Sequence, residues 1–223
     1  MSQQLFIQEH AGAFALVVGA IGANLALEWF VTARERMAGA GGRGRAAVLG
    51  GTLIEVSTSR TGAGATDDRG TKRLLVGSMV AGLVLGWVAA AHVAGATFPA
   101  WLCWPAVVTG AALILAGGGL RSWGIATLGR FFRRDVTIQA DHRVVIDGPY
   151  RLLRHPAYAG NLLAALGFGL ALTNWVGLVI AVGVPLLGHL PRIRVEERAM
   201  AGALGQEWVG YAAGTARIVP GVW

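Results

Sequence analysis

Long apolar runs with almost no charge inside them constrain this chain more than any other feature. About 20 apolar residues are needed for a helix to cross a bilayer. Three runs are about that long: Ala11–Thr32, Leu74–Ala96 and Trp101–Leu120. The first run carries Glu28 near its end, which we interpret either as an interfacial side chain or as a buried functional carboxylate.

Two shorter apolar runs follow, Ala159–Thr173 and Trp175–Leu190, joined by Asn174. Because both are shorter than a full span, we expect a helical hairpin that crosses only part of the membrane or lies where the protein is thin. Pro185 and Pro191 are expected to kink its second arm or to end it. The predicted fold class is therefore an all-α integral-membrane protein. Its five-helix bundle has three spans and a C-terminal helical hairpin.

Composition agrees with a membrane protein. Of the 223 residues, 54% are hydrophobic and only 14% are charged, against about 25% charged in soluble domains. The net charge is +7, but the arginines stand beside apolar runs and not in basic-aromatic patches, so we expect a lipid bilayer as partner and no nucleic acid. One cysteine excludes an intrachain disulfide, and the five scattered histidines form no metal-binding pattern, so no metal is expected.

The distribution of basic residues predicts the topology. All lysines and arginines fall in a polar loop at about residues 33–73, in residues 121–154 or in the C-terminal segment. By the positive-inside rule, the N-terminus lies outside, and the candidate site and the C-terminus are cytoplasmic. The first residues contain no lysine or arginine, so we expect no cleavable signal peptide. High alanine, glycine and arginine content suggests a bacterial inner membrane.

A polar bridge between apolar runs, Asp147–Gly160, contains a dense cluster of functional side chains. Pro156 can occupy the first turn of the next helix. That would hold Arg154, His155 and Tyr158 at a helix entrance, where free backbone N–H groups suit an anion. The alternative is a basic loop that only sets topology, with interfacial tyrosines.

A second polar cluster begins at Arg192 and includes Glu196 and Glu197. Arg192 and Glu196 are four residues apart and would share one helix face. They form either part of a site or a surface ion pair. No nucleophile elbow or Walker loop occurs in the sequence. The two clusters together suit binding of a nucleotide-like cofactor and an anionic substrate more than covalent catalysis.

The segment from His142 to Gly160, His-Arg-Val-Val-Ile-Asp-Gly-Pro-Tyr-Arg-Leu-Leu-Arg-His-Pro-Ala-Tyr-Ala-Gly, resembles the signature of the isoprenylcysteine carboxyl methyltransferase family. The later pieces Arg192-x-Arg-x-Glu196-Glu197 and Gly205-x-Glu-x-x-x-Tyr211 resemble its second block in order and spacing. The resemblance covers roughly Arg121 to the C-terminus. It divides the chain into an N-terminal transmembrane region, 1–120, and a catalytic region, 121–223.

The resemblance implies an integral-membrane methyltransferase that uses S-adenosyl-L-methionine and releases S-adenosyl-L-homocysteine. It implies catalytic roles for Arg192 and Glu196 and substrate binding by Arg192. The implied cofactor-binding residues come from both blocks: Gln139, His142, Arg143, Val144, Val145, Tyr150, Arg154, His155, Pro156, Ala157, Tyr158, Glu196 and Glu197.

The acceptor implied by the resemblance is lipophilic. It is either a carboxylate like that of an isoprenylcysteine or a related small thiol or amine. Phospholipid N-methyltransferases and membrane sterol reductases carry similar sequence pieces. An NADPH-dependent membrane reductase of the sterol-reductase type is therefore the alternative function.

Overall fold

The computed structural model describes residues 12, 15–24, 26–27, 29–30, 33, 70–129, 144–221 and 223. Four residues singled out in the sequence lie outside them: Glu28, Gln139, His142 and Arg143. The polar loop falls outside them too, from residue 34 to residue 69.

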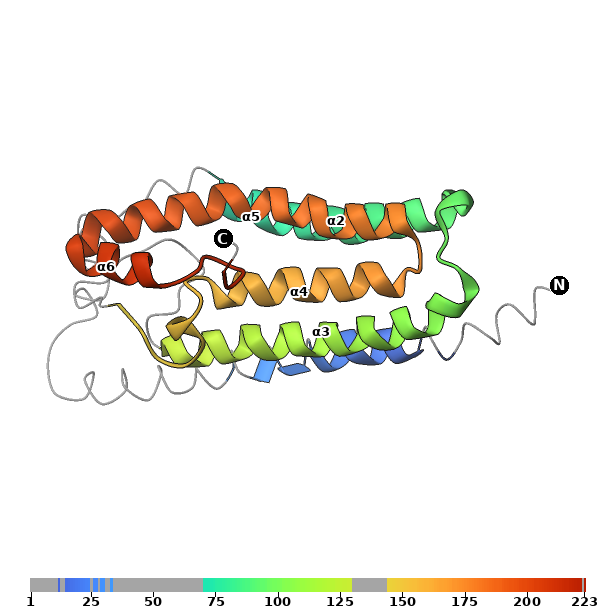
Figure 1. Ribbon diagram of the computed structural model, residues 1–223, viewed down its shortest axis with the longest axis horizontal. Coiled ribbons are helices and arrows are strands. Elements are labelled where there is room, and N and C mark those ends of the chain that lie inside the picture. Colours follow the sequence, from blue (N-terminus) through green and yellow to red (C-terminus); the bar gives the residue numbers. More distant parts are fainter. Residues whose placement is uncertain are drawn as a thin grey trace, which may run out of the picture.

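The described chain is an elongated bundle of helices (Figure 1). A short apolar helix spans Ala15–Asn24. Five further α-helices follow: α2 (Thr71–His92), α3 (Ala100–Leu128), α4 (Pro156–Ala171), α5 (Trp175–Leu204) and α6 (Gln206–Gly214). Two 3-10 turns, η2 (Ala94–Ala96) and η4 (Gly148–Arg151), lie in the connections. In Figure 1, α4 lies between α3 on one side and the paired α2 and α5 on the other.

The all-helical prediction is confirmed at this level, but the expected count of five helices is not. The described residues contain six α-helices, because a separate helix, α6, follows α5 in the C-terminal segment. The helix formed by the last apolar run is also longer than we predicted. The helix that we expected to stop near Leu190 continues to Leu204 and is long and apolar enough to cross a membrane. It is therefore a candidate full span and not half of a partial hairpin.

Helix α5 does not end at either of its prolines. A proline inside a helix removes one backbone hydrogen bond and crowds the preceding turn. In α5 the ring of Pro185 packs where Gly82 of α2 has no side chain, and a Cβ at Gly82 would meet that ring at 2.5 Å. The carbonyl oxygen of Pro185 also accepts a hydrogen bond from His189 Nδ1 at 2.7 Å. Neighbouring groups thus accommodate the proline, as they do in other transmembrane helices.

Small residues bring the helices into close contact. On α2, Gly82 and Gly86 face α5, and a Cβ at Gly86 would lie 3.0 Å from the carbonyl oxygen of Gly177. Helices α3 and α4 approach in the same way, because a Cβ at Gly117 would overlap the carbonyl oxygen of Gly160. These contacts hold the α3–α4 and α2–α5 pairs together over their lengths.

The outer surface of the bundle is apolar. Three helices, α2, α3 and α5, are long and apolar enough to span a membrane, and α4 is shorter. Large side chains such as Trp101, Val179 and Leu187 are 76%, 69% and 67% exposed. Exposed apolar surface of this extent, on helices of this length, identifies a multi-pass membrane protein.

The two ends of the bundle differ. At one end, Asn174 caps α5 by accepting from the Gly177 N–H at 3.0 Å and donates to the Val93 carbonyl at 2.9 Å. This end holds the α2–α3 and α4–α5 connections, which contain no charged residue. The opposite end holds the N-terminus of α4, the C-terminal part of α5, α6 and the chain terminus (Figure 1).

Candidate functional site

The segment before α4 is fixed by the C-terminal tail. Gly148 adopts a positive φ of 54° and begins η4. The backbone N–H groups of Arg154 and His155 donate to the carbonyls of Ala216 and Arg217 at 2.8 and 3.0 Å. The tail therefore pairs with the entrance to α4 as a short strand would, and sets the position of both side chains.

The tyrosine of the first block meets the second block. The hydroxyl of Tyr158 donates to Glu196 Oε1 at 2.5 Å. Arg192 Nε donates to the same oxygen at 2.7 Å and lies 3.3 Å from the Tyr158 hydroxyl. Arg192 is only 2% exposed, so the alternative of a surface ion pair is wrong. Its NH1 group also donates to the Thr71 hydroxyl of α2 at 3.4 Å.

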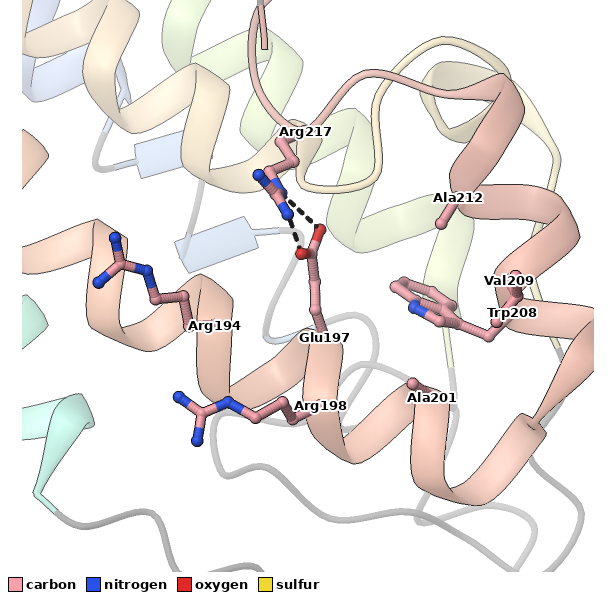
Figure 2. A pocket seen from close by; sticks show the side chains of 8 residues that line it. All are labelled: Arg194, Glu197, Arg198, Ala201, Trp208, Val209, Ala212 and Arg217. Carbon is pink, nitrogen blue, oxygen red and sulfur yellow. Dashed lines mark hydrogen bonds and ion pairs between the residues drawn. The ribbon is translucent and has the colours of Figure 1, made fainter.

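Glu197 forms ion pairs with a different set of residues. Arg154 NH1 lies 3.0 Å from Glu197 Oε1, and Arg217 Nε lies 3.0 Å from Oε2. The guanidinium of Arg217 also lies over the ring of Trp223, 5.2 Å from its centroid. The contact between Glu197 and Arg217, which joins α5 to the tail, is drawn in Figure 2.

His155 lies between the two carboxylates. Its Nδ1 is 3.6 Å from Glu196 Oε2, and its Nε2 is 3.5 Å from Glu197 Oε1. Its ring stacks on that of Tyr158 with centroids 5.6 Å apart. The two sequence blocks therefore converge on one side of the bundle, as we expected.

Two buried nitrogens in this cluster have no hydrogen-bond partner among the described residues, Arg154 Nε and His155 Nε2. Although His155 Nε2 is near Glu197, the geometry is not that of a hydrogen bond. A buried donor without an acceptor costs free energy, about 1–3 kcal/mol. Both would be satisfied by a ligand that carries a carboxylate or another oxygen acceptor.

Two tyrosines beside the cluster are held in their neutral form. Burial raises the pKa of Tyr150 well above its ordinary value. Burial likewise raises the pKa of Tyr211 to about 12. The hydroxyl of Tyr211 donates to the carbonyl oxygen of Tyr150 at 2.8 Å. This hydrogen bond ties α6 to η4.

The remaining predicted residues lie at the edge of this cluster. Val144 donates its backbone N–H to Glu207 Oε1 of α6 at 3.2 Å, and Val145 follows it in a segment without regular secondary structure. Pro156 begins α4, as predicted, and packs against Gly124 of α3. Ala157 is partly buried in the first turn of α4.

Sequence reasoning missed two residues that contact the cluster. Arg217 pairs with Glu197 from the tail, and His189 is fully buried with its ring edge against Tyr158, 5.2 Å between centroids. Neither residue has a spacing signal that links it to the other block. Arg217 and Glu197 are 20 positions apart, so no local sequence pattern predicts their contact.

Taken together, the fold and the site define a class of protein. It is a multi-pass membrane protein with an all-helical bundle and a compact Arg–Glu–His–Tyr cluster at one end. Comparison with known proteins narrows the class. The model of the isoprenylcysteine carboxyl methyltransferase (ICMT) family matches residues 110–202. The match confirms the resemblance that the two motif blocks indicated.

The curated relatives include a named methyltransferase and a protein named for metal resistance. The chain is 31% identical over 105 residues to protein-S-isoprenylcysteine O-methyltransferase B of Arabidopsis thaliana, covering 46% of this chain and 53% of the relative. It is 34% identical over 108 residues to the cobalt-zinc-cadmium resistance protein CzcN of Cupriavidus metallidurans, covering 46% and 47%. The chain thus spans about half the length of these curated relatives.

A solved structure shows the same fold. The eukaryotic intramembrane Ras methyltransferase ICMT aligns with a TM-score of 0.51 and 24% identity, covering 67% of this chain and 51% of that chain. At this identity the likeness concerns the fold alone.

Proposed function

We propose that this protein is an integral-membrane methyltransferase. It would transfer a methyl group from S-adenosyl-L-methionine to a lipophilic acceptor, such as the carboxylate of an isoprenylcysteine or a related small thiol or amine. The observation that carries the proposal is the convergence of His155 and Tyr158 with Arg192 and Glu196, which come from two separated blocks.

The residues present fit the amino-acid end of the proposed donor. When bound, S-adenosyl-L-methionine would supply an electrophilic methyl group on a sulfonium. The unpartnered nitrogens of Arg154 and His155 would hold a carboxylate. Glu196, with 21% of its side chain exposed, would accept from an ammonium or a ribose hydroxyl. The ring of Tyr158 would offer its face to a cation.

Arg192 is suited to orient an acidic acceptor. Its guanidinium is held by Glu196 on one side and by the Thr71 hydroxyl on another. A carboxylate is already a nucleophile at neutral pH, so the site needs no general base for it. Methyl transfer is a displacement in line, and the contribution of the protein is to place two reactants in a dry pocket. A lipid chain on the acceptor would remain between the helices.

The proposal is tested first by ligand-dependent stability. S-adenosyl-L-homocysteine at about 100 times its Kd should stabilise the purified protein by about 2.7 kcal/mol. That corresponds to a rise in Tm of about 5–10 °C for a chain of this size. NADPH at the same concentration should not shift Tm. Stabilisation by NADPH alone would instead support the sterol-reductase alternative.

Radiolabelled methyl transfer tests the acceptor. Purified protein, labelled donor and an S-prenylated cysteine should give a labelled, base-labile ester. An equal label on the cysteine whose carboxyl group is already esterified would contradict a carboxylate acceptor and favour another nucleophile in the lipid.

A further inference from the structure

A second polar feature lies beside the proposed active site and shares Glu197 and Arg217 with the cluster there. It is an open pocket of about 400 Å³ between α5, α6 and the tail (Figure 2). Three arginines line it, Arg194, Arg198 and Arg217, with Glu197 as the one acidic residue. Trp208, which is 8% exposed, forms part of its wall.

The charge of this pocket is not balanced within the described residues. Glu197 already faces Arg154 and Arg217. Arg194 and Arg198 are both exposed, and neither forms an ion pair with an acidic side chain of the described chain. Figure 2 shows them leaving successive turns of α5 on one side, while Glu197 points toward Arg217. The pocket thus presents two free guanidinium groups.

Helix geometry places these arginines on the face of α5 that meets lipid. With 3.6 residues per turn, residues 7 and 11 positions after Leu187 lie within about 20° of it around the helix. Those residues are Arg194 and Arg198. Leu187 is 67% exposed on a helix long and apolar enough to span the membrane. The two arginines therefore continue its lipid-facing stripe.

The position along α5 matches the level of lipid headgroups. Twenty residues at 1.5 Å each cross the roughly 30 Å hydrocarbon core. Counted from Trp175, where α5 begins, that length ends at Arg194, and Arg198 lies one turn beyond. The guanidinium groups would thus lie at the boundary between acyl chains and phosphates, beside a tryptophan, a residue that favours this interface.

We infer that this pocket binds the phosphate of an anionic phospholipid. The guanidinium groups of Arg194 and Arg198 would hold the phosphate oxygens, and the acyl chains would lie along the exposed face of α5 near Leu187. Arg194 and Arg198 are not among the proposed donor-binding residues, so the lipid would have no part in methyl transfer. A lipid there would anchor the α5–α6 corner at the membrane surface.

Native mass spectrometry of the full chain in detergent tests this assignment. Phosphatidylglycerol should bind wild-type protein more tightly than phosphatidylcholine. The double variant Arg194→Gln/Arg198→Gln should weaken phosphatidylglycerol binding by about fivefold for each arginine removed. Arg151→Gln is the matched control, because Arg151 is exposed at the same end but does not line the pocket. It should bind phosphatidylglycerol as wild type does.

Three results would overturn the inference: equal affinity for the two lipids, equal loss in the Arg151→Gln control, or unchanged binding in the double variant. If inorganic phosphate competed with equal arginine dependence, the ligand would be a soluble phosphate and the lipid assignment would be wrong. Binding of S-adenosyl-L-homocysteine should be unchanged in the double variant, so failure of this inference and failure of the proposed function are distinguishable.

Discussion

Two adjacent acidic residues, Glu196 and Glu197, organise the cluster through different partners. Consecutive residues of a helix point about 100° apart, so the two carboxylates cannot face the same group squarely. Glu196 takes the Tyr158 hydroxyl and Arg192, whereas Glu197 takes arginines from the α4 entrance and the tail. The His155 ring lies between the two carboxylates, with one ring nitrogen within 3.6 Å of an oxygen of each.

Tyr158→Phe tests the Glu196 half of the cluster. The change removes a hydrogen bond to a charged group, which contributes about 1.5–3 kcal/mol. Glu196 would then lose one of the groups that orient it. We expect the affinity for S-adenosyl-L-homocysteine to fall at least about tenfold, measured by isothermal titration calorimetry.

Tyr211→Phe is the matched control for that variant. It removes the donor to the Tyr150 carbonyl, outside the Glu196 network, and should lower Tm while leaving donor affinity within about twofold. If Tyr158→Phe bound the donor as well as wild type does, the result would support the alternative that Asp147–Gly160 is a basic loop that only sets topology.

At the scale of elements, the site depends on how closely α3 and α4 approach. Gly117 and Gly160 lie opposite each other, and a Cβ on either would overlap the backbone carbonyl oxygen of the other. The N-terminal turn of α4 carries Tyr158 and begins at Pro156. Spacing between the two helices therefore also sets the position of the tyrosine.

Gly117→Ala should accordingly destabilise the protein, by about 1–3 kcal/mol, because the added methyl group forces the backbones apart. Gly119→Ala is the control, since a Cβ at Gly119 meets no atom within 4 Å. Thermal unfolding in detergent should show a lower Tm for the first variant and an unchanged or slightly higher Tm for the second. Equal Tm values would show that the helices do not pack as described.

At the scale of the molecule, the two ends of the bundle should face opposite sides of the membrane. The uncharged turns, η2 and the Asn174 corner, lie at one end. The arginine-rich candidate site lies at the other. The positive-inside rule assigns the second end to the cytoplasm.

Cysteine labelling in intact cells tests this orientation after Cys103→Ser removes the native thiol. Gly95 and Gly202 are exposed positions with open space at the Cβ, one at each end. Gly95→Cys should react with a membrane-impermeant maleimide, and Gly202→Cys should react only after permeabilisation. The reverse pattern would invert the predicted topology, and equal labelling of both would contradict a spanning bundle.

The sequence predicted the features that depend on interactions between neighbouring residues. Apolar runs located two of the candidate spans, α2 and α3, Pro156 marked the start of α4, and the four-residue spacing placed Arg192 and Glu196 on one face. Each follows from hydrophobicity, backbone restriction or helix periodicity within a few residues. The division of the chain at residue 120 stays a prediction, and α3 runs across it.

Contacts between distant segments decided the rest. The Pro185 ring packs against α2 because Gly82, about a hundred positions earlier, leaves room for it. Arg217 joins the cluster because the tail pairs with the α4 entrance. The sequence by itself determined which segments are apolar, which are charged and which side chains share a helix face. Only the tertiary structure decided how the Pro185 ring packs and which charges are buried together, because both depend on groups that meet in space and not along the chain.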